Sequence, residues 1–129
     1  MPSVEEIAKI SVDCGFHLHR DIGPGLLESA YEILLFESLK EKGLFVERQK
    51  IIPITFRGRV WDEAFRADLI VEKRLLLELK STERHSPVHA KQLQTYLRLM
   101  DLPLGFLMNF GAATFKEGVK RLANNYFRG

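Results

Sequence analysis

The sequence has little cysteine and no long apolar run, and each absence excludes a class of protein. Cys14 is the only cysteine among 129 residues, so neither an internal disulfide framework nor a zinc site built from several cysteines can form. No apolar stretch approaches the ~20 residues that a membrane-spanning helix needs, and residues 1–6 are acidic rather than patterned like a secretion signal. These features predict a cytoplasmic protein without membrane contact.

A strong excess of charge of one sign is also missing, because the formal net charge is only +2. The charges are nevertheless unevenly spread: residues 1–83 contain 12 Lys and Arg against 15 Asp and Glu, whereas residues 84–129 contain 7 against 2. The basic second part can offer phosphate contacts, although a solvated helix face explains any single one of these residues equally well. With 46% hydrophobic residues, we expect residues 1–129 to form a single globular domain.

Three polar side chains stand out in the middle of the chain, where Asp68 is followed ten residues later by Glu78 and then by Lys80. Alternate residues of a strand share a face, so Glu78 and Lys80 project together. A tight hairpin that pairs Ile70 with Leu76 would set Asp68 opposite Glu78. The same register places one apolar face on one side of the sheet, made of Phe65, Ala67, Leu69, Val71, Leu75, Leu77 and Leu79.

These three residues suit a magnesium-dependent phosphodiesterase. Mg²⁺ takes oxygen ligands, usually one or two protein carboxylates with waters and substrate phosphate, and a nearby ammonium group can hold or deprotonate the attacking water. A half-solvated strand face with a weak surface ion pair between Glu78 and Lys80 explains this hairpin alone equally well. The hypothesis therefore depends on what the rest of the chain brings to it.

Four helices and several strands are expected along the chain. Ser3 and Glu6 form a capping-box pattern that begins a helix to about Asp21. After a break at residues 23–25, a second helix is expected to run to Lys42. Strands are expected near residues 44–47, 50–57, 60–71 and 75–80, with a turn at 57–59. The remaining elements are a helix, a buried strand and a closing helix, at residues 88–101, 104–110 and 116–127.

The helices carry two further polar patterns. Gly25, Glu28 and Tyr31 are three residues apart and would follow one face of the second helix. A carboxylate that faces inward there is costly unless it is paired or meets a metal ion, although Glu28 could instead favour the helix dipole or pair with a base. Gln92 and Tyr96, four residues apart, share a face of the helix at 88–101. That second pattern is weak alone.

Together these motifs resemble the GxxExxY proteins, a branch of the PD-(D/E)XK nuclease-like superfamily. The resemblance covers about residues 10–125, and all its motifs occur in the family's order. The residues that carry it are Gly25-x-x-Glu28-x-x-Tyr31, Asp68, Glu78-Leu79-Lys80 and Gln92-x-x-x-Tyr96. It implies an α/β or α+β fold with a restriction-endonuclease-like core, in which helices flank a mixed central sheet. Ala67 stands where the superfamily's name has proline, a position that holds no metal.

The resemblance also implies a role for each motif. The ion would be Mg²⁺ or Mn²⁺, and Lys80 would position or activate the attacking water. Gln92 would support the site or contact the phosphate. The implied metal ligands are Asp68, Glu78, Glu28 and the backbone carbonyl of Leu79. The implied supporting residues are Gly25, Tyr31 and Tyr96, with Tyr31 packing or hydrogen-bonding beside Glu28.

The implied function is metal-dependent hydrolysis of DNA or RNA phosphodiester bonds. Two alternatives stay open, a non-catalytic module that binds nucleic acid or protein, and a hydrolase acting on another phosphate ester such as a nucleotide. A homodimer contact or a protein partner is a further expected source of specificity. Aromatic residues in the strand segments are expected in the core more often than stacked on bases. They are Phe56, Trp61 and Phe65.

Overall fold

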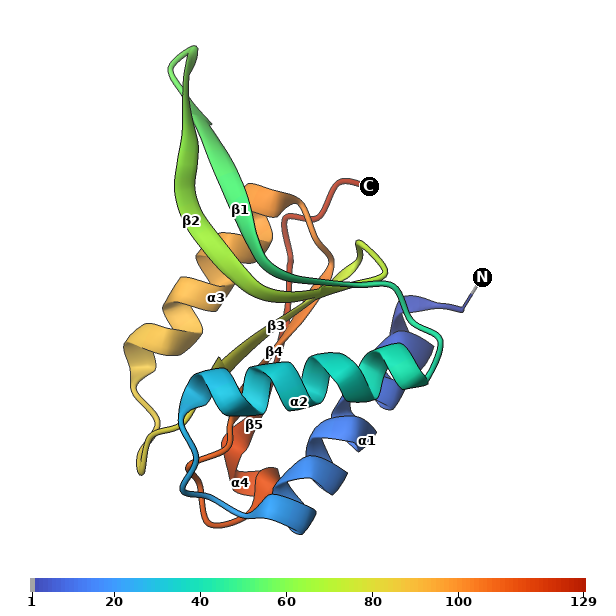
Figure 1. Ribbon diagram of the computed structural model, residues 1–129. Helices are drawn as coiled ribbons and strands as arrows, with labels where there is room; N and C mark the ends of the chain where they lie inside the picture. Colours follow the sequence, from blue (N-terminus) through green and yellow to red (C-terminus); the bar gives the residue numbers. More distant parts are fainter. Residues whose placement is uncertain (1) are drawn as a thin grey trace.

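The computed structural model describes residues 2–129, which fold around one mixed five-stranded sheet (Figure 1). The helices are α1 (Val4–Ile22), α2 (Glu28–Glu41), α3 (Pro87–Met100) and α4 (Phe115–Gly118). The strands are β1 (Val46–Phe56), β2 (Arg59–Val71), β3 (Leu75–Lys80), β4 (Leu104–Asn109) and β5 (Val119–Ala123). The strands neighbour one another in chain order, with β3 and β4 parallel and the other neighbours antiparallel. The predicted fold class is confirmed.

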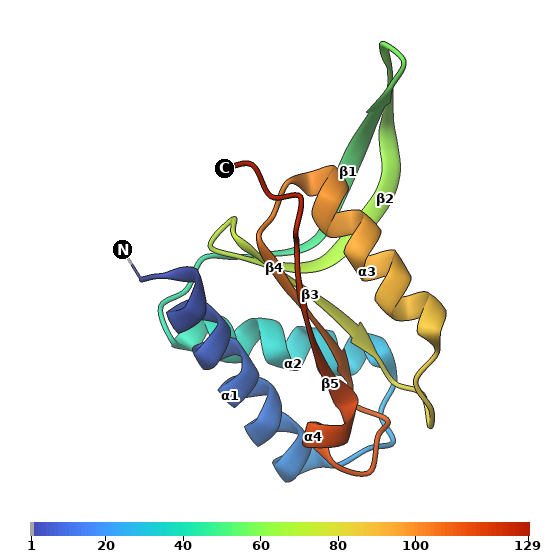
Figure 2. The ribbon, with the colours of Figure 1, turned by 180° about the vertical axis from the view of Figure 1, so that it is seen from behind.

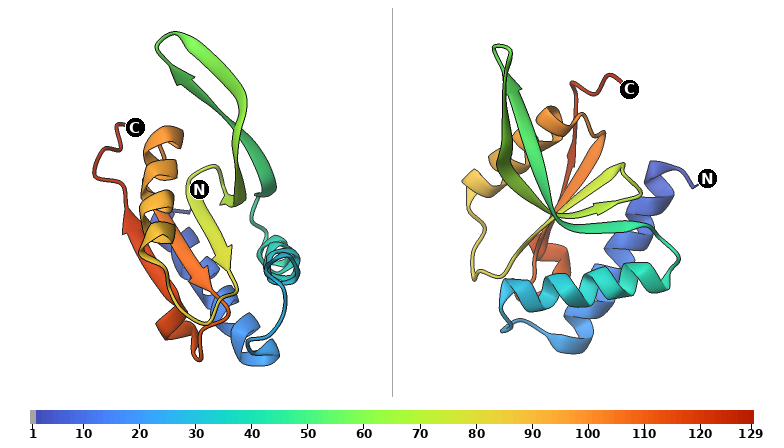
Figure 3. Two further views of the ribbon diagram at one scale, coloured as in Figure 1. Left: turned by 90° about the vertical axis from the view of Figure 1, so that its left-hand side faces the viewer. Right: turned by 45° about the horizontal axis from the view of Figure 1, so that its top comes forward.

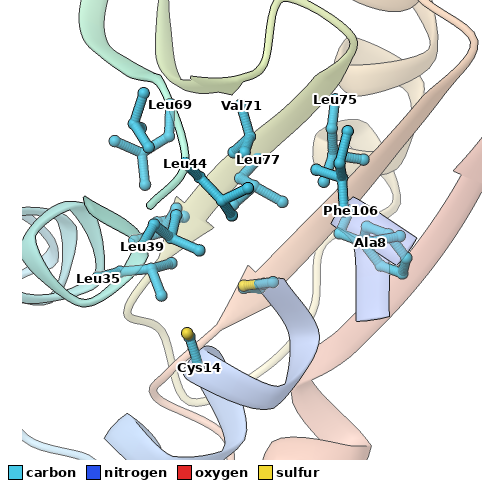
Figure 4. Packing of buried hydrophobic residues seen from close by; sticks show 14 of the residues in the cluster. Ala8, Cys14, Leu35, Leu39, Leu44, Leu69, Val71, Leu75, Leu77 and Phe106 are labelled. Atoms are coloured by element: carbon cyan, nitrogen blue, oxygen red, sulfur yellow. The ribbon is translucent and has the colours of Figure 1, made fainter. Parts of the chain in front are cut away.

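The sheet separates two apolar layers. Helices α1 and α2 cover one face, and α3 lies on the other (Figures 2 and 3). Strand β3 supplies both layers, because Leu75, Leu77 and Leu79 pack toward α1 and α2 while Leu76 packs toward α3. Figure 4 shows the first layer, where Leu35 and Leu39 of α2 approach the sheet. A strand buried on both faces is a rigid support for the polar residues at its end.

The start of the chain follows the sequence pattern closely. Ser3 and Glu6 form the predicted capping box, since each side chain accepts a hydrogen bond from the backbone N–H of the other. Helix α1 ends at Gly23, whose φ of 77° is the left-handed conformation that glycine adopts readily. No helix within residues 2–129 has the length and apolar character needed to cross a membrane.

The second helix begins later than expected. Leu27 is its N-cap, so Gly25 lies in the preceding loop with a φ of 123° and does not share a helical face with Glu28 and Tyr31. That backbone conformation is nearly exclusive to glycine, which explains why a glycine stands there. The expectation that Glu28 faces inward is also wrong, because its side chain is exposed at the first position of α2.

The hairpin between β2 and β3 has the predicted register, with Ile70 opposite Leu76. Its ladder of backbone pairs reaches Leu69 and Leu77, one step before Asp68 and Glu78. The predicted apolar face is confirmed at the β3 leucines but is wrong at its far end. Phe65 and Ala67 pack with the α3 layer instead of the layer that contains Leu69.

The change of face occurs beside an irregular point in β1. The predicted segments 44–47 and 50–57 form one strand, and within it Gln49 has a left-handed φ of 52°. Pairing with β2 passes from Arg48–Leu69 to Lys50–Ala67, so Gln49 and Asp68 are left out of the regular ladder. The left-handed φ of Gln49 interrupts the regular alternation of side chains along β1 at this point. Gln49 therefore lies directly beside Asp68.

The closing helix predicted at residues 116–127 is wrong. One turn of helix, α4, leads into β5, which pairs with β4 from Met108–Val119 to Leu104–Ala123. A Cβ at Gly118 would lie 2.2 Å from the carbonyl oxygen of Asn109, so the close approach of the chain to β4 requires glycine. Without β5, the backbone groups on the edge of β4 away from β3 would be unpaired, and this tertiary contact overrides the helical pattern.

Candidate active site

Asp68 and Glu78 lie side by side where the backbone ladder between β2 and β3 ends. The Leu79 N–H donates a hydrogen bond to Oδ2 of Asp68 over 2.9 Å, and the Asp68 N–H donates to Oε1 of Glu78 over 3.4 Å. Where the next backbone hydrogen bonds between β2 and β3 would form, the N–H groups of Leu79 and Asp68 instead donate to the side-chain oxygens of Asp68 and Glu78. Lys80 follows two residues after Glu78 on the same face of β3. The structure therefore brings together the three residues that the sequence singled out.

Glu78 is the most strongly perturbed carboxyl group of the site. It is only 8% exposed, and burial, reinforced by the neighbouring Asp68 carboxylate, raises its pKa to about 9. The positive charge of Lys80 acts in the opposite direction, toward a lower pKa. Without a further cation, this shift favours the protonated form of Glu78 beside Asp68 at neutral pH.

Gln49 is a site residue that sequence reasoning missed. Its Nε2 donates hydrogen bonds to Oδ1 of Asp68, over 3.2 Å, and to Oε1 of Glu32. The irregular backbone at Gln49 aims the amide at these two carboxylates. Both oxygens of Asp68 thus have a donor, one from Gln49 and one from Leu79. Nothing in the local polar pattern of β1 distinguishes Gln49 from an ordinary solvated strand residue.

Glu32 is the second residue that was missed. It is 5% exposed, and Arg48 lies 3.7 Å from its carboxylate. Burial raises the pKa of Glu32, with the Asp68 charge adding to the shift and the Gln49 hydrogen bond and Arg48 opposing it. A sequence signal did exist, because Glu32 is four residues after Glu28 and therefore shares its helical face.

Glu28 stands at the edge of the site. Partial burial raises its pKa, Lys80 lowers it and Asp68 raises it, so these charges act on one another. It lines an open hollow of about 600 Å³ together with Glu32, Arg48 and Gln49. Within residues 2–129 no three His, Cys, Asp or Glu side chains are grouped closely enough to hold one ion. Glu28 is thus adjacent to the Asp68–Glu78 pair and not joined to it.

Helix α3 closes the other side of the site. The ring of Tyr96 stacks on Phe65 with centroids 3.9 Å apart. Burial raises the pKa of Tyr96, the charges of Glu78 and Asp68 raise it further, and the Gln92 side chain beside it acts in the opposite sense. Tyr96 is therefore near enough to the two carboxylates for their charges to act on its hydroxyl, and Gln92 lies one turn before it on α3. The Gln92 side chain itself is exposed.

Tyr31 has a different surrounding from the one expected. It is fully buried, and its ring stacks on Phe110 with centroids 4.7 Å apart. Its hydroxyl donates to the Gly23 carbonyl and accepts from the Leu26 N–H, so it braces the loop before α2 instead of bonding to Glu28. The Ser81 hydroxyl, just after β3, donates to the Leu26 carbonyl over 2.7 Å. Tyr31 and Ser81 therefore tie the start of α2 to the end of β3.

The chemistry of the central pair fits a hard divalent cation. Burial is the main cause of the raised Glu78 pKa, and the Asp68 charge adds to it; a cation beside the two groups would offset both effects by stabilising the ionised form of Glu78. Mg²⁺ needs only one or two protein carboxylates, with water and phosphate completing its coordination. The pair Asp68 and Glu78 meets that requirement without a third side chain.

Two carboxylates beside a lysine at the end of a hairpin supply the residue types that can hold a divalent cation and stabilise charge next to it. The family model of the PD-(D/E)XK nuclease superfamily matches residues 5–122, and the chain belongs to this superfamily. No curated protein and no solved structure matched the chain. Nucleases of this superfamily generally use divalent metal ions, and the family points to a nucleic acid as substrate.

The bridge made by Gln49 leads to a prediction. Replacing Gln49 with methionine keeps the side-chain length but removes both hydrogen bonds, leaving Asp68 with one donor and Glu32 without its amide partner. Loss of such an orienting partner typically weakens metal binding about 10-fold to 100-fold. We expect Gln49→Met to weaken Mn²⁺ binding, measured by calorimetry, by about this factor. Gln94→Met, which removes a bond to the Ala123 carbonyl, is the matched control, and equal Mn²⁺ affinity in both variants would contradict the role.

Proposed function

We propose that the protein is a divalent-metal-dependent nuclease that hydrolyses phosphodiester bonds of DNA or RNA. Asp68 and Glu78 would hold Mg²⁺ or Mn²⁺, and Lys80 would act on the attacking water. The observation that carries the proposal is the contact between the Asp68 and Glu78 groups beyond the end of the β2–β3 ladder, with Lys80 next on the same face. The superfamily membership supports the same reaction class.

The backbone of Leu79 is suited to a further ligand role. In an antiparallel pair, the N–H and C=O of one residue point to the same neighbouring strand. The Leu79 N–H is directed at Asp68, so the Leu79 carbonyl lies on that side as well. Bound there, a divalent cation supplies Lewis acidity toward the phosphate and lowers the pKa of water. The Gln49 amide and the Leu79 backbone N–H orient the Asp68 carboxylate, because each donates a hydrogen bond to one of its oxygens.

The residues around the pair have distinct proposed roles. Glu28, whose charge interacts with Lys80 and Asp68, would add negative charge at the edge of the site and bind a second ion or an ion-bound water. Gln92 would donate its amide to a phosphate oxygen, supported by Tyr96. Gly25 and Tyr31 would act at a distance, by fixing the loop that positions Glu28. These roles accord with the GxxExxY resemblance.

A cleavage assay tests the proposal directly. Labelled single-stranded and double-stranded DNA and RNA are incubated with the protein in Mg²⁺, in Mn²⁺ and in EDTA. We expect cleavage of at least one substrate with either ion and none in EDTA. Nucleotide hydrolysis with intact polynucleotides would instead favour the phosphate-ester alternative. Metal-independent binding of nucleic acid without cleavage would favour a non-catalytic module.

Lys80 separates metal binding from water activation. Lys80→Met keeps the length of the side chain and removes its charge, while no ion pair within 4 Å among residues 2–129 involves Lys80. We expect cleavage to fall at least about 100-fold and Mn²⁺ affinity, measured by calorimetry, to fall much less. A variant that cleaves at the wild-type rate would remove Lys80 from the mechanism. Lys73→Met at the exposed β2–β3 turn is the control.

A further inference from the structure

The outer part of the β1–β2 hairpin projects away from the rest of the molecule (Figures 1 and 3). Side chains near its tip are exposed, including Phe56 at 58% and Trp61 at 45%. Arg57 and Gly58 form the turn with positive φ values of 51° and 75°, as a two-residue hairpin turn requires. Large apolar side chains in such a position do not contribute to the core.

Arginine and aromatic side chains are combined at the tip. The guanidinium of Arg57 lies 5.2 Å from the centre of the Phe56 ring, and that of Arg59 lies 5.4 Å from Trp61. Phe56 is directly opposite Arg59, and Trp61 is opposite Ile54. Because alternate residues share a face, Ile54, Phe56, Arg59 and Trp61 lie on one face of the hairpin, and Arg57 is in the turn next to Phe56. Ring faces and cations presented together fit the bases and phosphates of a nucleic-acid strand.

The charge at the tip is of one sign. Both charged residues within 54–61 are arginines, whereas Asp62 and Glu63 occur below the tip at the bulge in β2. In a symmetric contact between two copies, the same face would meet itself and bring arginine against arginine. A polyanionic strand matches this face without such repulsion. The charge pattern therefore favours nucleic acid over a second copy of the chain.

The base of the hairpin connects the tip to the candidate site. Ile52 and Ala67 pack in the α3 layer, and Phe65 stacks on Tyr96. Tyr96 in turn is within the electrostatic influence of Glu78 and Asp68. From Arg59 to Asp68, strand β2 spans about 30 Å at about 3.3 Å per residue. The base of the β1–β2 hairpin is thus held beside Asp68 and Glu78, and its tip lies several nucleotide lengths away from them.

We propose that residues 54–61 bind a single-stranded segment of the nucleic-acid substrate, several nucleotides away from the scissile phosphate. Arg57 and Arg59 contact phosphates, and Phe56 and Trp61 stack on unpaired bases. This inference rests on the proposed nuclease function for the identity of the partner. It assigns the substrate class, because a fully paired duplex does not offer its base faces to these rings.

Trp61 is the only tryptophan of the chain, so its fluorescence reports on this hairpin alone. Single-stranded DNA and RNA 15-mers and the corresponding duplexes are titrated into the protein in EDTA, which prevents cleavage. We expect saturable quenching by single strands, with weaker or no quenching by duplex. Because affinity falls as salt increases, the plot of log affinity against log salt has a slope of about −0.7 per phosphate contact for single strands.

Two variants and one control complete the test. Arg57→Gln/Arg59→Gln is expected to reduce the salt slope by about 1.4, equivalent to two phosphate contacts, and Trp61→Ala to weaken single-strand binding about 10-fold, read by anisotropy of a labelled oligonucleotide. Lys116→Gln/Lys120→Gln removes the same charge from exposed positions in α4 and β5, at the other edge of the sheet, and should change the slope less.

The outcomes separate this inference from the nuclease proposal. Absence of binding, binding without Trp61 quenching, or unchanged affinity in both hairpin variants would overturn the hairpin's role, whatever the cleavage assay shows. A dimer that Trp61→Ala converts to a monomer at unchanged oligonucleotide affinity would also overturn it, in favour of self-association. Quenching and the expected losses, together with no cleavage in Mg²⁺ or Mn²⁺, would support the hairpin's role and contradict the nuclease.

Discussion

Replacing Asp68 with asparagine is expected to lower kcat/KM for phosphodiester cleavage about 1000-fold or more. The change keeps the size of the side chain but removes one of the two negative charges available to a cation. A metal ion contributes several kcal/mol to stabilising the transition state, and about 4 kcal/mol corresponds to a factor of roughly 1000. The measurement is the initial rate on the best substrate of wild type at saturating Mg²⁺.

The control for this variant is Asp13→Asn, an exposed aspartate on α1, which should cleave at the wild-type rate. Circular dichroism and thermal unfolding show whether Asp68→Asn is folded. Wild-type activity in a folded Asp68→Asn protein would remove Asp68 from the mechanism and, with it, the proposed metal site.

Glu78→Gln is expected to make the metal-free protein more stable as pH rises, relative to wild type, while abolishing cleavage. The pKa of Glu78 is about 9 in the folded state, against 4.5 as its ordinary value. Between these values the folded state holds a proton that the unfolded state has released, so the free energy of unfolding of wild type falls as pH increases. The slope is at most about 1.4 kcal/mol per pH unit. Glutamine does not titrate, so the free energy of unfolding of the variant lacks this decrease with pH.

Urea unfolding in EDTA at pH 5, 7 and 9 measures the difference. Because Glu37 is exposed on α2, Glu37→Gln is the control and should follow wild type at each pH. Metal binding requires the ionised carboxylate, so Mn²⁺ affinity of wild type should also rise across this range. A stability difference between wild type and Glu78→Gln that does not change with pH would mean that Glu78 is not held protonated beside Asp68.

Local patterns were sufficient where local physics decides the structure. The capping box at Ser3 and the Ile70–Leu76 register follow from short-range hydrogen bonding and from the alternation of leucines with polar residues. The position of Asp68 beside Glu78 followed from that register. These predictions needed no information about distant parts of the chain.

Other features depend on contacts between segments far apart in the sequence. Strand β5 forms in place of a predicted helix because it pairs with the backbone groups of β4, and Gly118 permits the close approach to Asn109. Gln49 reaches Asp68 and Glu32 only through its left-handed backbone in the middle of β1. Single-residue irregularities of this kind leave no periodic signal, which is why the sequence motif identified the carboxylates but not the amide that orients one of them.

Calorimetric titration of Mn²⁺ into metal-free wild type and Asp68→Asn, at pH 8 where Glu78 ionises more readily than at neutral pH, probes the proposed metal site without relying on cleavage. We expect saturable binding to wild type, with release of a proton, and at least a 100-fold loss of affinity in Asp68→Asn. Equal binding to both proteins, or no binding to wild type even with a single-stranded oligonucleotide present, would contradict a metal site at Asp68 and Glu78.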